Sequence, residues 1–156
     1  MKWTLLAVGR VMPPPIRELV EEYGDRLRHF IPLRLESVAE EKRDKNVTPR
    51  LAMEREGQRL RSRCPATAWI VALDGSGQSW SSLELSRQVE QWIQAGHSEV
   101  VFVIGGPDGL DPVFKSSAHQ ILSLGPMTYP HMLVRVLILE QLYRAMTLLR
   151  GVPYHR

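Results

Sequence analysis

Cysteine is nearly absent from this sequence, and its scarcity excludes two classes of small protein. The 156 residues hold one cysteine, Cys64, which rules out an internal disulfide framework and a cysteine-based zinc site. No apolar run approaches the roughly 20 residues that a membrane-spanning helix needs. The apolar run at 3–9 is ended by Arg10 and the prolines too soon for a secretion signal. We therefore expect a cytoplasmic protein with no membrane partner and one domain, 1–156.

Lysine is also scarce, and arginine supplies most of the positive charge. Of 20 basic residues, 4 are lysine and 16 are arginine, and with 17 acidic residues the net charge is +3. The planar guanidinium group binds phosphate in a bidentate manner, so this composition is compatible with a nucleic-acid or nucleotide partner. An excess of +3 is also common among basic enzymes that bind no nucleic acid. Charge alone leaves both interpretations open.

Several ligand-binding and catalytic motifs are missing. No GxGxxG follows the first apolar segment and no GxxxxGK[ST] occurs, which excludes the standard dinucleotide and P-loop sites. HExxH and paired histidines of the metal-binding type are absent, so we expect no metal. The GxSxG turn that carries the nucleophile in many hydrolases is absent as well.

Strand-like and helix-like segments alternate along the whole chain. Short apolar or alternating segments predict strands, and apolar residues at three- and four-residue steps predict helices. The expected strands are 3–9, 33–39, 68–74, 99–106 and 121–125, and the expected helices are 13–30, 48–63, 81–96, 112–118 and 132–149. A charged loop is expected at 40–46 and a flexible turn at 75–80. Such alternation predicts an α/β fold, with a mostly parallel sheet flanked by helices.

Two helices carry more specific signals. Ser81 and Glu84 form a capping box for the third helix, on which Leu85, Val89, Trp92 and Ile93 are expected to share one apolar face. The last helix, 132–149, is apolar around most of its circumference, as expected for a helix that is buried on nearly all sides. A chain of this length supplies few partners for such a helix, so its composition favours a dimer interface.

Glycines stand at the ends of three expected strands. The three segments are Leu73-Asp74-Gly75, Ile104-Gly105-Gly106 and Leu124-Gly125-Pro126. Ligands of parallel sheets bind beyond the carboxyl ends of the strands, and glycine lets a ligand approach the main chain. Strand-to-helix turns also use glycine for their own geometry, so one such end is weak support. Three together predict a cleft.

The last helix and the tail hold the remaining candidates. Glu140 and Arg144 are four residues apart in the order that favours an ion pair, and an arginine on a buried helix near a cleft is also a functional candidate. The tail places Tyr154, His155 and Arg156 in a row, a set able to stack on a base and contact phosphate. Chain ends are more often idle, and the spacing alone favours that interpretation.

Long segments of the sequence resemble the RlmH family. These are IGGPDGL (104–110) and LSLGPMTYPHMLVRVLILEQLYRAMTLLRGVPYHR (122–156), together with AVGR (7–10), EEYGDRL (21–27), EKRDKN (41–46) and IVALDGSG (70–77). That family comprises small bacterial methyltransferases of the SPOUT, or trefoil-knot, class, which modify a pseudouridine of large-subunit ribosomal RNA. The resemblance implies a deep knot in the C-terminal part of the chain, an exception to the rule that chains are unknotted.

The resemblance also implies a cofactor, partners and site residues. S-adenosylmethionine is expected in the knot of a homodimer whose active site is shared between subunits, with Gly105 leaving room for the ligand. The implied cofactor contacts are Leu73, Gly105, Leu124, Gly125, Pro126, Met127, Thr128 and Tyr129. The implied catalytic residues, facing the target nucleotide, are Arg144, Tyr154 and His155. The implied RNA-binding residues are Arg10, Lys42, Arg43, Lys45 and Arg156.

The expected reaction is methyl transfer to N3 of a pseudouridine on the assembled ribosome. Arg144 would stabilise negative charge on the base, and His155, with an ordinary pKa of about 6.5, would accept the N3 proton. Two alternatives stay open: a knotted methyltransferase acting on another RNA such as transfer RNA, and a non-catalytic ribosome-binding assembly factor. The second stays open because Gly125-Pro126 departs from the family pattern, and Pro126 has no N–H to donate.

Overall fold

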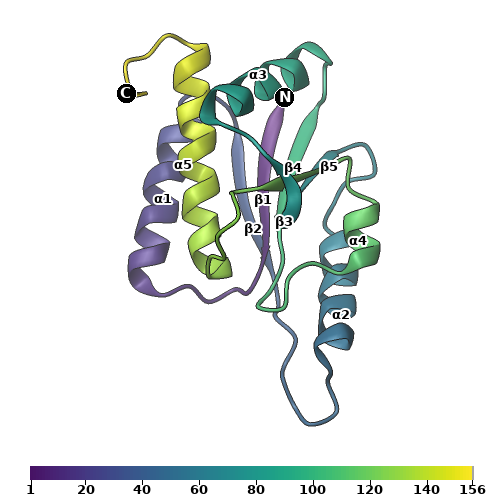
Figure 1. The fold of residues 1–156 in the computed structure, drawn as a ribbon. Coiled ribbons are helices and arrows are strands. Elements are labelled where there is room, and N and C mark those ends of the chain that lie inside the picture. The colour runs from purple at the N-terminus through teal and green to yellow at the C-terminus, as the bar shows by residue number, and fades with distance from the viewer. Residues whose placement is uncertain (156) are drawn as a thin grey trace.

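The computed structural model describes residues 1–155, and strands and helices alternate along them (Figure 1). The elements are β1 (Lys2–Val8), α1 (Pro14–Arg28), β2 (Leu33–Val38), α2 (Pro49–Arg61), β3 (Trp69–Ser79), α3 (Ser82–Gln94), β4 (Glu99–Ile104), α4 (Pro112–Ser116), β5 (Gln120–Ser123) and α5 (His131–Leu149). Each strand and helix expected from the sequence is present. The single-domain α/β fold is therefore confirmed.

The strands form one sheet in the order β2-β1-β4-β3-β5. Each pair of neighbouring strands is parallel, so the carboxyl ends of all five strands lie at one edge of the sheet. This confirms the parallel sheet. Strand pairing does not establish how the chain threads, so the C-terminal knot stays a prediction.

Helices cover both faces of the sheet. α1, α3 and α5 pack on one face, where Trp3 and Trp92 both meet Phe102 edge-on with ring centroids 5.7 and 5.8 Å apart. α2 and α4 cover the other face, where Leu60 and Phe114 pack on the apolar side chains of the strands. In Figure 1, α1 and α5 run side by side on the left and α2 and α4 lie on the right. Both faces are covered, as the near-continuous apolar strands require.

Side-chain caps begin three of the helices. Ser81 accepts a hydrogen bond from the Glu84 amide while the Glu84 carboxylate accepts one from the Ser81 amide, which confirms the capping box. Thr48 and Asp111 cap α2 and α4 in the same way through a single acceptor. These contacts satisfy amide groups that have no partner inside the helix.

Two local expectations were wrong. The expected flexible turn at 75–80 belongs mostly to β3, because Gln78 and Ser79 pair with Leu122 and Ser123 of β5 after a register shift that follows Leu73. Ile93 does not share the buried face of α3 and is 45% exposed. It follows the buried Trp92, and one helical step turns a side chain by about 100°.

Within residues 1–155, no helix is both long enough and apolar enough to cross a membrane.

Candidate functional site

A cavity of about 790 Å³ opens at the carboxyl edge of the sheet. It is bounded by β3 at the register shift that follows Leu73, by the ends of β4 and β5, by the loop between β5 and α5, and by the first turn of α5. This confirms the predicted cleft, although Leu73-Asp74-Gly75 lies within β3 and not at its end. The whole predicted cofactor set lines it, namely Leu73, Gly105, Leu124, Gly125, Pro126, Met127, Thr128 and Tyr129. Its volume lies in the range of roughly 300–1,000 Å³ that is typical of small-molecule sites.

Residues 105–109, called here the wall, form one side of this cavity. The Gly109 amide donates to the Gly106 carbonyl at 2.9 Å, which closes the wall into a tight turn. A Cβ atom on Gly105 would lie 2.6 Å from the Gly109 carbonyl carbon. Gly105 is therefore needed first for the fold of the wall itself, in addition to any room that it leaves for a ligand.

The loop from β5 to α5 forms the opposite side of the cavity. Gly125 has a φ of 113°, a conformation that favours glycine. The Met127 side chain is 69% exposed at the rim, although it is large and apolar. An exposed apolar side chain at the mouth of a cavity is suited to cover a bound ligand.

Four polar residues that were not predicted as site residues also line the cavity: Asp74, Asp108, Ser123 and His131. Burial acts to raise the pKa of Asp74, but hydrogen bonds from Ser76 and Lys115 outweigh it and hold that pKa below its ordinary value. The Ser76 hydroxyl lies 2.5 Å and the Lys115 ammonium 3.2 Å from this carboxylate. Asp74 is therefore an ionised carboxylate within β3 that is paired with Lys115 at the cavity.

His131 begins α5 at the cavity. Burial lowers its pKa, and the nearby Arg135 guanidinium lowers it further, so the imidazole is neutral at pH 7. Arg135 is only 4% exposed and donates to the Val8 and Gly9 carbonyls at 2.5 and 2.7 Å. This arginine fixes the first turns of α5 to the end of β1. The sequence signal that could have identified His131 is a histidine that directly follows a proline, Pro130, where a helix begins.

Two of the three predicted catalytic residues lie together at the far end of α5. Arg144 donates to Glu140 at 2.5 Å, which confirms the expected ion pair. The Tyr154 hydroxyl donates to the same carboxylate at 3.1 Å, and the Arg144 guanidinium carbon lies 4.7 Å from the Tyr154 ring centroid. Bonding to Glu140 raises the pKa of Arg144, and burial raises that of Tyr154. A fixed cation thus packs on a neutral phenol.

The structure does not bring this cluster to the cavity of the same chain. α5 starts at the cavity and has 19 residues. At about 1.5 Å per residue it spans roughly 28 Å. Figure 1 shows the C-terminal tail, in yellow, at the opposite end of α5 from its start. His155 is exposed in this tail.

The predicted RNA-binding residues lie at the same sheet edge as the cavity. Arg10 is exposed just after β1, and Lys42, Arg43 and Lys45 lie in the loop that follows β2. Among the described residues, Lys42 and Lys45 form no ion pair, whereas Arg43 pairs with Asp108 at 2.6 Å. The Arg43 guanidinium group is therefore already paired with a carboxylate of the wall. Arg156 lies outside the described residues.

The described residues contain no cluster of three or more histidine, cysteine, aspartate or glutamate side chains able to hold a metal ion.

Fold and cavity together define a class of protein. A parallel α/β sheet with a cavity at the carboxyl ends of its strands is the arrangement of small-molecule-binding α/β proteins. A family model described as "Predicted SPOUT methyltransferase" matches residues 1–155. The chain belongs to the SPOUT methyltransferase family.

Individual relatives are similar over the whole chain. A protein of Hahella chejuensis named "Ribosomal RNA large subunit methyltransferase H" is 42% identical over 100% of this chain and 99% of its own length. A protein of the same name from Thioalkalivibrio sulfidiphilus is 41% identical with the same coverage. A solved structure titled "Crystal Structure of Probable Methyltransferase from Bordetella pertussis Tohama I" superposes with a TM-score of 0.58 at 15% identity, covering 93% of this chain and 96% of that chain. That likeness shows the fold alone.

Proposed function

We propose that this protein transfers a methyl group from S-adenosylmethionine to N3 of a pseudouridine in large-subunit ribosomal RNA. The observation that carries the proposal is that the whole predicted cofactor set lines one cavity of about 790 Å³ in a chain of the SPOUT methyltransferase family. The RNA substrate is supported by full-length relatives that are named ribosomal RNA large subunit methyltransferases.

The residues of the cavity fit this cofactor. Leu73, Leu122 and Leu124 offer an apolar surface for a flat adenine ring, and backbone groups of the neighbouring glycines lie beside them. The Asp74 carboxylate, kept ionised by Ser76 and Lys115, suits a ligand that carries positive charge. When bound, S-adenosylmethionine supplies the methyl group on a cationic sulfur.

The cluster at the far end of α5 suits the nucleotide. Methyl transfer requires alignment of the two reactants and loss of the N3 proton. The Arg144 cation, held by Glu140, is placed to stabilise negative charge on the base. The Tyr154 ring is placed to stack on a base, and the exposed His155 imidazole is our candidate proton acceptor.

The distance between cavity and cluster supports a homodimer. Arg144, on which Tyr154 packs, lies 13 residues along α5 from His131, about 20 Å at 1.5 Å per residue. We infer that this cluster completes a site at the cavity of a second copy. A half-exposed face of α5 favours such a pairing, because its members recur at three- and four-residue steps. They are Leu133, Leu137, Gln141, Arg144 and Leu148. The exposed Arg10, Lys42 and Lys45 at the cavity edge then face RNA of the assembled ribosome.

The test is a methyl-transfer assay with labelled S-adenosylmethionine. The substrates are intact ribosomes, isolated large subunits and free ribosomal RNA from cells that lack the enzyme, with the product nucleoside identified by mass. We expect N3-methylpseudouridine, formed fastest on intact ribosomes. Cofactor binding without transfer to these substrates would favour another RNA, such as transfer RNA. Absence of both binding and transfer would favour a non-catalytic ribosome-binding factor.

A further inference from the structure

A buried glutamate supports the wall from outside the cavity. Glu56 of α2 is 1% exposed and does not line the cavity, whereas Gly106 of the wall does. A Cβ atom on Gly106 would lie 2.6 Å from Glu56 Oε2 and 3.2 Å from a methyl group of Val8. The Glu56 carboxyl group therefore rests against the Gly106 backbone, and the position of one depends on the other.

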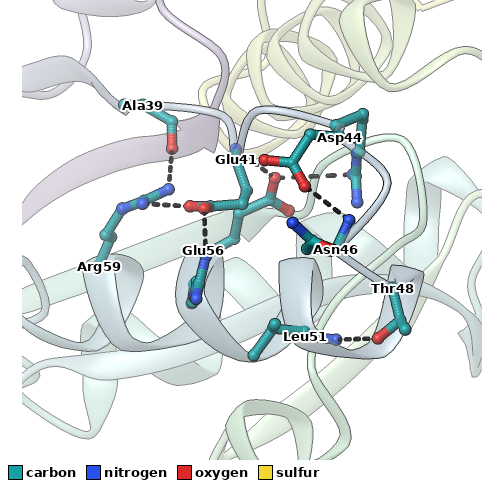
Figure 2. A network of polar contacts seen from close by, with 10 residues as sticks. Ala39, Glu41, Asp44, Asn46, Thr48, Leu51, Glu56 and Arg59 are labelled. Carbon is teal, nitrogen blue, oxygen red and sulfur yellow. Dashed lines mark hydrogen bonds and ion pairs between the residues drawn. The ribbon is translucent and has the colours of Figure 1, made fainter.

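The same glutamate anchors the loop between β2 and α2, residues 39–48. Its Oε1 atom accepts a hydrogen bond from the Glu41 amide at 2.8 Å. The Glu41 carboxylate in turn accepts bonds from Arg55 and Arg59, and Arg59 donates to the Ala39 carbonyl at 3.1 Å. Figure 2 shows this network, with Glu41 and Ala39 held over α2. The loop is thus fixed to the helix that supports the wall.

Arg43 of this loop reaches the wall directly. Its Nη1 atom lies 2.6 Å from Asp108 Oδ2, and its Nη2 atom lies 3.7 Å from Glu56 Oε1. The Arg43 and Asp108 side chains are 35% and 32% exposed, so water partly screens their attraction. Asp108 is a wall residue that lines the cavity. Wall, loop and helix therefore meet around one guanidinium group and one buried carboxyl group.

We propose that Glu56 is a positioning residue that holds the wall in its binding conformation, and that the Arg43–Asp108 ion pair clasps the wall to loop 39–48. This inference rests on the proposed function and deepens it, because it makes the affinity for S-adenosylmethionine depend on two residues outside the cavity. Arg43 of the predicted RNA-facing loop then contacts the wall as well, which connects the S-adenosylmethionine site to the predicted RNA-binding loop.

Two substitutions of Glu56 separate positioning from packing. Glu56→Gln keeps the shape of the side chain and an oxygen that accepts from the Glu41 amide. Glu56→Leu keeps a similar side-chain volume but is apolar, so it leaves that amide without its partner. We expect Glu56→Gln to bind S-adenosylmethionine within about twofold of the unaltered protein, and Glu56→Leu to bind about 5- to 30-fold more weakly.

The clasp is tested by a double-mutant cycle with Arg43→Gln and Asp108→Asn. Calorimetry on the full chain should show that Arg43→Gln weakens S-adenosylmethionine binding about three- to tenfold, and that this effect vanishes in the Asp108→Asn background. The exposed Arg50, which forms no ion pair among the described residues, gives the matched control Arg50→Gln. Equal losses in both backgrounds, or unchanged binding in Glu56→Leu, would overturn the proposal.

Hydrogen exchange of the wall amides tests the proposal independently of the ligand. We expect faster exchange at residues 106–109 in Glu56→Leu and Arg43→Gln, and unchanged exchange in Glu56→Gln and Arg50→Gln. If the unaltered protein binds no S-adenosylmethionine, the proposed function fails, and exchange at the wall still decides whether Glu56 and Arg43 position it. If Glu56→Leu does not fold, the surface variant Arg43→Gln still tests the proposal by both measurements, S-adenosylmethionine binding and hydrogen exchange of the wall.

Discussion

At the scale of single residues, Glu56 is a glutamate whose burial is only partly compensated. Burial raises its pKa above the ordinary value of 4.5, while the Glu41 amide and Arg43 act to lower it. Its Oε2 atom has no hydrogen-bond partner among the described residues. A carboxyl group that is easier to ionise in the unfolded chain than in the folded one makes stability depend on pH.

The sign of that dependence gives a prediction for Glu56→Gln. Below pH 4.5 the carboxyl group is mostly protonated in both states, so it adds little pH dependence. As the pH rises, the unfolded state releases its proton first, so the unaltered protein loses stability relative to the variant. Thermal melts followed by circular dichroism should show the melting temperature of Glu56→Gln gaining on that of the unaltered protein as the pH rises above 4.5.

Glu54→Gln is the matched control, since Glu54 is an exposed glutamate on the same helix. A difference between Glu56→Gln and the unaltered protein that stays constant across this pH range would contradict the raised pKa, and so would a difference that falls.

At the scale of elements, the sequence predicted most helices and strands because their apolar periodicity is strong. β3 was cut short because residues 75–79 hold two glycines and two serines, a composition typical of turns. Pairing with β5 overrides that local preference, since β5 supplies hydrogen-bond partners for Gln78 and Ser79. Where composition favours a turn, only the distant pairing partner shows that the segment is a strand.

The same limit applies to the site. The cavity could be predicted because strand ends in a parallel sheet converge at one edge, and the individual residues came from the family resemblance. The role of Arg43 could not be predicted, because its partner Asp108 lies far along the chain and no spacing rule links them. A basic residue in a charged loop was interpreted as facing RNA, whereas the folded chain pairs it with the wall.

The capping box of α3 allows a test of how far a local sequence signal contributes to stability. Ser81→Ala removes the acceptor for the Glu84 amide, so we expect a loss of about 1 kcal/mol in the free energy of unfolding, measured by urea denaturation. Ser98→Ala, at an exposed serine outside any helix, is the control and should change this free energy little. Equal effects of the two substitutions would show that the cap contributes nothing.

At the scale of the whole molecule, α5 separates the two halves of the proposed site. Its first turn lines the cavity, and its last turns carry Arg144 and lead to the tail with Tyr154 and His155. Because a helix is rigid over this length, the separation of about 20 Å along α5 between His131 and Arg144 is fixed. The proposed homodimer resolves the separation if each tail serves the cavity of the other copy.

A heterodimer of two inactive chains distinguishes a shared site from one confined to a single chain. One chain carries Leu124→Trp, which fills the cavity, and the other ends at residue 152 and lacks the tail. In a shared site, the heterodimer pairs the intact cavity of the second chain with the intact tail of the first, so one of its two sites works. We therefore expect about half of the unaltered activity per dimer, from heterodimers purified through two different tags after co-expression.

Each parent homodimer should be inactive, and light scattering confirms that the purified species is a dimer. If instead each cavity used its own tail, both sites of the heterodimer would lack one component, and it would be as inactive as its parents.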